Sequence, residues 1–181
     1  MSSSYPYIGP PEIAIRVRSA PTGVRIDQPD DVLQWIRQTR QEPDRVGNLT
    51  ATFVIDESGN LRIADRRSEH VACAGGRAVL SAGEMTFQVL GKTVEVSQVS
   101  NQSTGYCPEP ESWPAVQGAL GKAGISPPDG FDPVFQFRRC VQCGAKNLIK
   151  DDIFECGVCS APLPVDWNFH LTPDPKAGSF R

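Results

Sequence analysis

Four of the six cysteines in this 181-residue chain form two pairs with the same internal spacing. The pairs are Cys140/Cys143 and Cys156/Cys159, and residues 144–155 separate them. In a Cys-x-x-Cys turn both sulfurs point to the same side. Two such turns at the ends of a short hairpin therefore present four thiolates at the corners of a tetrahedron, the geometry of a structural Zn²⁺ site. We predict one Zn²⁺ ion bound by these four cysteines.

The spacer between the pairs fits a minimal hairpin. Residues 147–149 and 153–155 are predicted as short strands around the turn 150–152, and Gly144 follows the first pair where positive φ is often needed. The stretch resembles the zinc ribbon class, which implies a local fold and a coordinatively closed, non-catalytic metal site. Iron in a rubredoxin-like Cys₄ site is the alternative, since tetrahedral sulfur ligation suits both metals. A redox pair or two disulfides explain the double motif less well.

Composition narrows the classes of function. The net charge of −3 and the pI near 5.4 argue against a general nucleic-acid binder, which carries a basic excess. No apolar run reaches membrane-spanning length, and the N-terminal residues lack the apolar core of a signal peptide. Together with the metal-type cysteine spacing, this predicts a cytoplasmic protein.

Hydrophobic periodicity predicts the elements of the remaining chain. Alternation predicts a strand at 13–17, a first hairpin at 49–63 and a second hairpin at 85–99. Period-3.6 patterns predict one helix from a cap at Asp27 or Asp30 to about residue 41, and another after Ser112 that ends before Gly124.

These elements predict an α+β fold of two β-hairpins and two helices, with the zinc ribbon appended at the C-terminal end. The proposed divisions are a flexible arm at 1–11, an α+β domain at 12–133, the ribbon at 134–169 and a flexible tail at 170–181. The proline- and glycine-containing residues 126–133 mark the boundary, and we expect the ribbon to dock on the main domain.

Two glycine-containing segments, 69–84 and 100–108, bracket the second hairpin and carry the polar groups of a candidate site. The candidate catalytic residues are His70, Glu84 and Tyr106, and the candidate ligand-binding residues are Gly75, Gly76, Asn101 and Ser103. Glycine permits close approach of the backbone to a ligand. We expect His70 and Tyr106 to line one concave site at one end of the sheet, with Gly76 and Glu84 at its edge. The alternative is that both are buried anchors.

The same segments carry a resemblance. His70, Gly75-Gly76 and Gly83-Glu84, a strand pair, and then Ser103-Thr104-Gly105-Tyr106-Cys107-Pro108 resemble a module of plant IQ-motif calmodulin-binding proteins and related bacterial toxin-like proteins. The resemblance covers roughly residues 50–123. The family pattern Ser-Gly-His-Tyr-x-Pro differs here, because Thr104 is inserted and the histidine is missing. The resemblance implies no settled activity, and no IQ element is visible.

Three functions follow as hypotheses. The first is a zinc-stabilised accessory or recognition protein that binds a protein or a small ligand near segments 69–84 and 100–108. The second is an enzyme, a group transferase or toxin-like effector, with His70 as acid or base and Glu84 or Tyr106 as its partner. The third is nucleic-acid binding through the ribbon, which the charge disfavours. Cys73 and Cys107 are expected to be reduced core thiols.

Overall fold

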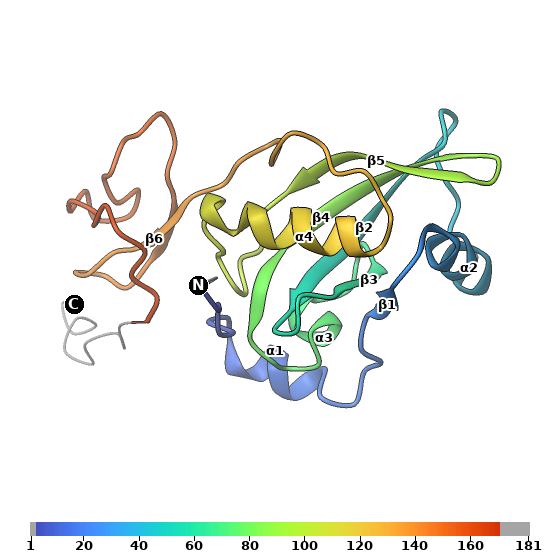
Figure 1. Ribbon diagram of the computed structural model, residues 1–181. Helices are drawn as coiled ribbons and strands as arrows, with labels where there is room; N and C mark the ends of the chain where they lie inside the picture. The colour runs from blue at the N-terminus through green and yellow to red at the C-terminus, as the bar shows by residue number, and fades with distance from the viewer. Residues whose placement is uncertain (1–2, 171–181) are drawn as a thin grey trace. The chain divides into compact units, whose positions relative to one another are not determined.

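The computed structural model describes residues 3–170, and the chain divides into two compact units between Val134 and Phe135 (Figure 1). Helices and antiparallel sheets together confirm the α+β class. Within residues 3–170, no helix combines the length and the apolar character needed to cross a membrane.

Unit 1 is built on a five-stranded antiparallel sheet with the strand order β1-β3-β2-β4-β5. The strands are β1 (Val24–Ile26), β2 (Asn48–Asp56), β3 (Leu61–Asp65), β4 (Val79–Leu90) and β5 (Thr93–Ser100). The two predicted hairpins are the pairs β2–β3 and β4–β5, and β2 joins them by pairing with β4 along its whole length.

One face of this sheet holds the main core. The residues of β2 that were predicted to share a face, Leu49, Ala51, Phe53 and Ile55, are all buried there. Helix α2 (Pro29–Thr39) adds Val32 and Trp35 to this core, and helix α4 (Trp113–Lys122) adds residues such as Leu120. Figure 1 shows α4 lying across the sheet. The short helix α3 (His70–Cys73) contacts β2 and β3.

The expectation of a strand at residues 13–17 was wrong, because Pro11–Arg16 form helix α1. Pro11 occupies the first turn, where its missing N–H costs nothing, and Glu12 and Arg16 complement the helix dipole at the two ends. The apparent alternation marked no buried face, since Ile15 is 63% exposed.

The N-terminal end of α2 also differs from the prediction. Its N-cap is Gln28, which forms a reciprocal capping box with Asp31, and Pro29 occupies the first turn. The C-terminal helix α4 is preceded by Ser112 as predicted, but the Ser112 hydroxyl does not cap the helix and bonds to Ser81 Oγ at 2.9 Å. A 3₁₀ turn, η1 (Pro110–Ser112), leads into it.

Strand β4 is longer than predicted, because it begins at Val79 and includes residues 79–84 that were assigned to a loop. Gly83 explains the difference. A Cβ at this position would collide with the Ser100 carbonyl oxygen and lie 3.0 Å from Asn101 Cα, because the chain leaving β5 passes directly over it. The glycine serves close backbone packing inside a strand and does not end the strand.

Residues 5–8, within the predicted flexible arm, are hydrogen bonded to the rest of unit 1. Tyr5 is buried and exchanges two main-chain hydrogen bonds with Val79, at 2.7 and 3.0 Å. The Ile8 N–H donates to the Gly105 carbonyl at 2.8 Å, and the rings of Tyr7 and Tyr106 meet edge to face.

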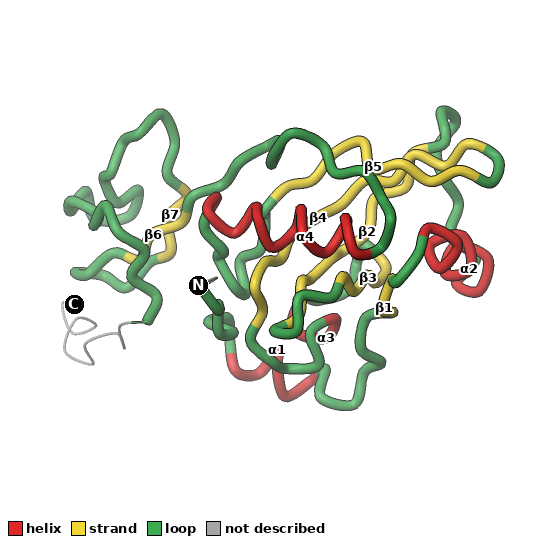
Figure 2. The backbone as a smooth tube through the Cα atoms, viewed as in Figure 1, coloured by secondary structure: helices red, strands yellow, loops and turns green. Residues whose placement is uncertain are grey.

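Unit 2 contains the strands β6 (Phe137–Arg139) and β7 (Lys146–Leu148), which pair antiparallel (Figure 2). The predicted pairing of 147–149 with 153–155 was therefore wrong. Residues 146–148 pair with 137–139, and the predicted turn 150–152 is closed by a single bridge between Lys150 and Ile153. Apart from His170, the predicted tail lies outside the described residues.

Two glycine substitutions test this packing in opposite directions. Gly83→Ala should lower the free energy of unfolding by at least about 2 kcal/mol, because the new methyl group meets backbone that cannot move away cheaply. Gly118→Ala should raise it by about 0.5–1 kcal/mol, since a Cβ there meets open space on α4 and alanine favours the helix. Urea unfolding followed by circular dichroism measures both. A neutral Gly83→Ala would contradict the described crossing.

Candidate metal centre and the segments around His70

The two cysteine pairs of unit 2 sit in two turns with matching backbone hydrogen bonds. The Cys140 N–H donates to Ala145 O and the Cys156 N–H donates to Ala161 O, both at 2.8 Å. Each turn then closes with an N–H that donates back to the first cysteine, from Gly144 and from Ser160, both at 2.9 Å. Gly144 and Ser160 both have positive φ, 75° and 58°. The turns are two copies of one local structure.

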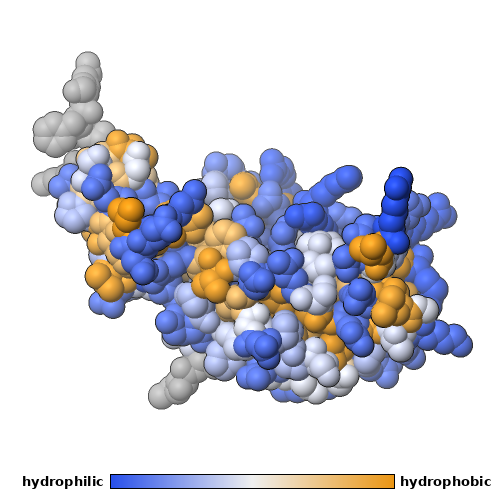
Figure 3. All heavy atoms as spheres, turned by 90° about the horizontal axis from the view of Figure 1, so that it is seen from above, coloured by the Kyte–Doolittle hydropathy of each residue, from blue (hydrophilic) through white to orange (hydrophobic). Residues whose placement is uncertain are grey.

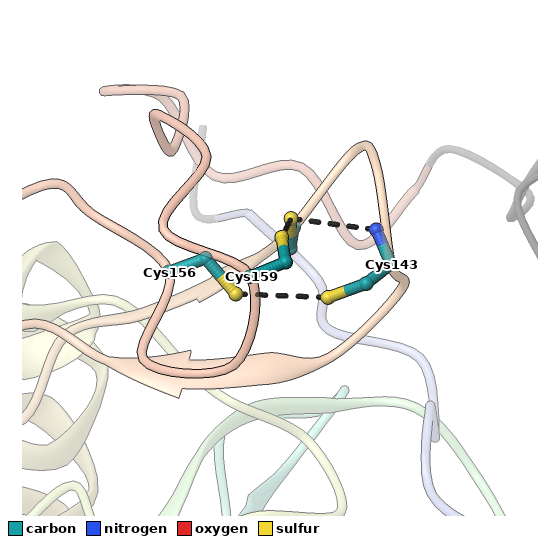
Figure 4. Close-up of side chains that lie close together, drawn as sticks. Cys143, Cys156 and Cys159 are labelled. Atoms are coloured by element: carbon teal, nitrogen blue, oxygen red, sulfur yellow. Dashed lines mark hydrogen bonds between the residues drawn. The ribbon is translucent and has the colours of Figure 1, made fainter. Parts of the chain in front are cut away.

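The four sulfur atoms converge (Figure 4). Cys140 Sγ lies 3.5 Å from Cys159 Sγ, Cys143 Sγ lies 3.6 Å from Cys156 Sγ, and all four lie within 4.8 Å of one another. A tetrahedron with metal–sulfur bonds of about 2.3 Å has edges of about 3.8 Å. The separations fit that figure and exclude a disulfide, so the four cysteines are positioned to coordinate one metal ion.

Hydrogen bonds favour the charged form of Cys156, whereas desolvation and the neighbouring sulfurs raise the pKa of Cys143 and of Cys159. The N–H groups of Cys143 and Val158 lie 3.5 and 3.4 Å from the sulfurs of Cys140 and Cys156. The pKa of Cys156 is lowered to about 6, chiefly by the backbone N–H of Cys159, with further contributions from Val158 and the Asn147 amide. A thiolate is the form that binds a metal, so this environment prepares Cys156 as a ligand.

Asn147 connects the two turns, and the sequence analysis gave it no role at the metal site. Its amide nitrogen donates to Ala145 O at 3.0 Å and lies 3.5 Å from Cys156 Sγ, while its amide oxygen accepts from the Gly157 N–H at 2.9 Å. One side chain on β7 thus holds the second turn against the first. Outer contacts of this kind orient the ligands of a metal site.

A second group of polar contacts ties residues 165–169 to β6. The Arg138 side chain is 1% exposed and donates to the carbonyls of Val165 and Phe137, and the Asn168 amide exchanges two hydrogen bonds with the Arg139 main chain. Asn168 therefore imitates a neighbouring strand on the edge of β6 opposite β7. Neither side chain was identified from sequence, because a buried arginine or asparagine looks like a surface residue in the pattern.

In unit 1 the His70 imidazole is bonded to the main chain. Its Nε2 lies 3.0 Å from the Gly83 carbonyl oxygen, which can only accept, so Nε2 carries the proton. Burial lowers the pKa of His70, and this outweighs the hydrogen bond to Gly83 and the charges of Glu84 and Glu69. The ring is therefore held neutral at the point where β5 leaves β4.

Tyr106 is also bonded to the main chain. Its side chain is fully buried, and its hydroxyl donates to the Arg77 carbonyl oxygen at 2.7 Å. Burial raises the pKa of its phenol, with a smaller contribution from Cys73. Tyr106 is thus bonded to the segment that follows α3, whereas His70, which lies in α3, is bonded to Gly83 of β4.

The other candidate site residues are dispersed around this segment. Glu84 forms an ion pair with Arg66 at 3.1 Å and lines a small recess of about 110 Å³ with residues such as Thr86 and Gln102. Gly75 lines a separate cavity, described below, while a Cβ at Gly76 would meet open space. His70 and Tyr106 line neither of these two spaces.

Besides Tyr106, two of the candidate residues lie inside the 100–108 segment. The Asn101 amide nitrogen donates to Pro108 O at 2.9 Å, closing the segment on itself. Ser103 is 1% exposed, and its hydroxyl has no hydrogen-bond partner among the described residues. Cys107 is buried with φ of 45°, and its Sγ lies 3.7 Å from the Thr104 carbonyl oxygen. Burial raises the pKa of Cys73 to about 12, so this thiol is protonated at neutral pH.

Comparison of the chain with models of known families, with curated proteins and with solved structures finds no match. The resemblance of residues 50–123 to the plant IQ-motif module therefore has no support from a family model. The group of four cysteines, which the sequence predicts as a metal site, is also brought together in the structure.

His70 gives a pH-dependent prediction. The folded state binds the proton more weakly than the unfolded state, whose histidine pKa is about 6.5. The stability from neutral His70 is therefore complete above about pH 7 and is lost as the pH falls through the unfolded-state pKa towards the lower pKa of the folded state. In His70→Gln this part of the pH dependence should disappear. Urea unfolding at a series of pH values measures the slope, and equal slopes in both proteins would contradict the burial of a neutral ring.

Proposed function

We propose that this protein is a cytoplasmic, zinc-stabilised accessory protein that recognises a partner and carries out no chemistry at its metal centre. The observation that carries the proposal is the convergence of four cysteine sulfurs within 4.8 Å. Four thiolates complete the coordination of a tetrahedral ion and leave no position for water or substrate. The centre then serves the fold of unit 2, and the function belongs to the surfaces that the fold presents.

Zinc is the metal that the surroundings favour over iron. Zn²⁺ has no redox chemistry and suits a purely structural Cys₄ site built from two turns. Tetrahedral sulfur ligation also suits iron, and the metal analysis described below distinguishes the two ions. The assignment of zinc, like the cytoplasmic location, belongs to this proposal.

Exposed apolar side chains support a protein partner for unit 2. Among the described residues 135–170, five large hydrophobic side chains are between 37 and 73% exposed: Val141, Leu148, Ile153, Val158 and Val165. Figure 3 shows hydrophobic residues at the surface of this unit. Val141 and Val158 each occupy a middle position of a cysteine turn, next to the metal-binding sulfurs. Apolar groups displayed on a small rigid unit are typical of a protein-binding surface.

The enzyme hypothesis rests on the closeness of His70 and Glu84, whose charge acts on the imidazole. The hydrogen bonds made by His70, Tyr106 and Glu84 favour the hypothesis of a binding protein over that of an enzyme. The protonated nitrogen of His70 and the hydroxyl of Tyr106 are both committed to main-chain carbonyls, and the Glu84 carboxylate pairs with Arg66. Each group holds the segments 69–84 and 100–108 in place, and those segments then present the binding surface of unit 1.

Metal analysis tests the structural centre. The purified protein should contain one zinc per chain, and Cys156→Ser should lose it and make residues 137–169 sensitive to protease, because binding to deprotonated thiolates contributes on the order of 10 kcal/mol to folding. Elemental analysis and limited proteolysis measure the two effects.

Two further variants, expected to differ in zinc affinity, extend the same test. Asn147→Ala should retain zinc with an affinity about 10–100-fold lower in chelator competition, since the contact between the two turns is removed. Gln142→Ala, an exposed change in the first turn, should bind zinc like the parent protein. Full zinc retention by Cys156→Ser, or iron in place of zinc, would refute the assignment.

The apolar turns give the test of recognition. In cells that express the tagged protein, a chemically cross-linked partner should be lost when Val141 and Val158 are both changed to Asp, with zinc content unchanged. The matched control is Val46→Asp in unit 1, where valine is 64% exposed and the partner should be kept. Quantitative mass spectrometry compares the three. Equal recovery of the same protein by all three would show that these turns are not the recognition surface.

A further inference from the structure

Unit 1 contains a cavity of about 400 Å³ that the sequence analysis did not identify. Its walls come from residues before and in β1, from the turn between β2 and β3, and from the segment that follows α3, which lie near one another in Figure 1. The lining includes three arginines and two acidic residues: Arg25, Arg62, Arg77, Asp56 and Glu57. The volume lies in the range of sites for small molecules.

The Asp56 carboxylate is occupied by the protein itself. One of its oxygens accepts from the backbone N–H groups of Ser58 and Asn60, both at 3.0 Å, and the other accepts from the Asn60 amide at 3.3 Å and from Arg62 Nε at 3.0 Å. Burial opposes ionisation of this carboxyl group, but these donors outweigh burial and lower its pKa. Asp56 therefore builds the wall and has little capacity left to attract a cation.

Arg62 is held in a fixed position between two acceptors. Besides the bond to Asp56, its Nη1 donates to the Gly23 carbonyl oxygen at 3.2 Å, and its side chain is 28% exposed. Fixing one side of the guanidinium reduces the entropy lost when its free edge meets a ligand. A planar guanidinium presented in this way is suited to the two oxygens of a carboxylate or a phosphate.

The other two arginines have weak attachments or none. Within the described residues, no hydrogen bond or ion pair holds the Arg77 side chain, which is exposed. Arg25 pairs with Asp27 at 2.7 Å, but both side chains are more than half exposed, so the pair is weak. Thr22 and Ser58 add hydroxyl groups to the same wall. Besides Asp56, the lining contains the Glu57 carboxylate, which accepts from Ser4 Oγ at 3.4 Å, and the three arginine side chains outnumber these two acidic residues.

We propose that this cavity binds a small oxyanion, a molecule bearing a phosphate or a carboxylate group, through Arg62, Arg77 and Arg25. Arg62 supplies the fixed donor, and the two exposed arginines close on the ligand from opposite walls. Gly75, one of the candidate ligand-binding residues, lines the same cavity and packs closely on Thr22, because a Cβ there would lie 2.9 Å from the Thr22 methyl carbon. The proposal rests on the proposed function only in placing a binding surface at segment 69–84, and it is independent of the metal centre.

Titration calorimetry with sodium pyrophosphate and, separately, with citrate tests the site on the full-length protein at constant ionic strength. At least one of the two anions should bind, and the stronger one identifies the class of oxyanion. Arg25→Gln combined with Arg77→Gln should weaken that binding at least tenfold. Arg37→Gln removes one exposed charge from α2, away from the cavity, and should leave binding unchanged. Amide NMR shifts on titration should centre on Ser58 and Gly75.

The proposal is overturned if neither anion binds more tightly than chloride, or if the double variant binds as well as the Arg37→Gln control. Zinc content is measured in the same samples. If the parent protein contains zinc and is stably folded but binds neither anion, only this site is refuted, whereas absence of zinc refutes the proposed function and leaves the titration interpretable. Arg62 is left intact because its contacts with Asp56 and Gly23 make it part of the fold.

Discussion

The pairing of β2 with β4 is the interaction on which unit 1 depends. It joins residues 48–56 to residues 79–88 and so connects two hairpins that are separately local in sequence. Single hairpins are marginally stable in water, and only the joined sheet offers a continuous apolar face to α2 and α4. The pairing also fixes the positions of the segments outside the sheet. His70 and Tyr106 hold the connection between the hairpins through hydrogen bonds to Gly83 and Arg77.

The fold of unit 2 is stabilised in a different way. Among its described residues, one hydrophobic cluster contains four buried residues, Cys140, Cys156, Ala161 and Leu163, of which two are metal-ligand candidates, and the rings of Phe137 and Phe169 are also buried. Burial of so little apolar surface cannot offset the conformational entropy of the segment. Hydrogen bonds from polar side chains therefore hold the backbone segments of this unit together, as a hydrophobic core does in a larger domain. Asn147 joins the two cysteine turns, Asn168 completes the edge of β6, and Arg138 anchors the residues that return past that strand.

The predictable parts of the chain are those in which one local signal dominates. Alternation through Phe53 gave the correct strand face because the residues of that face join the main core. The cysteine spacing identified the candidate metal centre because few other structures require it. The helix at Pro11–Arg16 was missed because Ile13 and Ile15 alternate without a strand to pair with. The register of β6 with β7 and the roles of Asn147 and Arg138 depend on contacts that are remote in sequence, and local pattern carries no information about them.

Within each of the two cysteine turns, the two sulfur-bearing residues differ in their exposure to solvent. In each pair the first cysteine, Cys140 or Cys156, is buried, and the second, Cys143 or Cys159, is exposed. Susceptibility of a thiolate to oxidation follows its charge and its access to solvent. An electrophile or peroxide arriving from solution therefore meets the second sulfur of each turn first. In the proposed function, damage at either exposed sulfur would remove a metal ligand while the buried cysteine of the same turn stays intact, so loss of the metal would precede loss of the fold of unit 2.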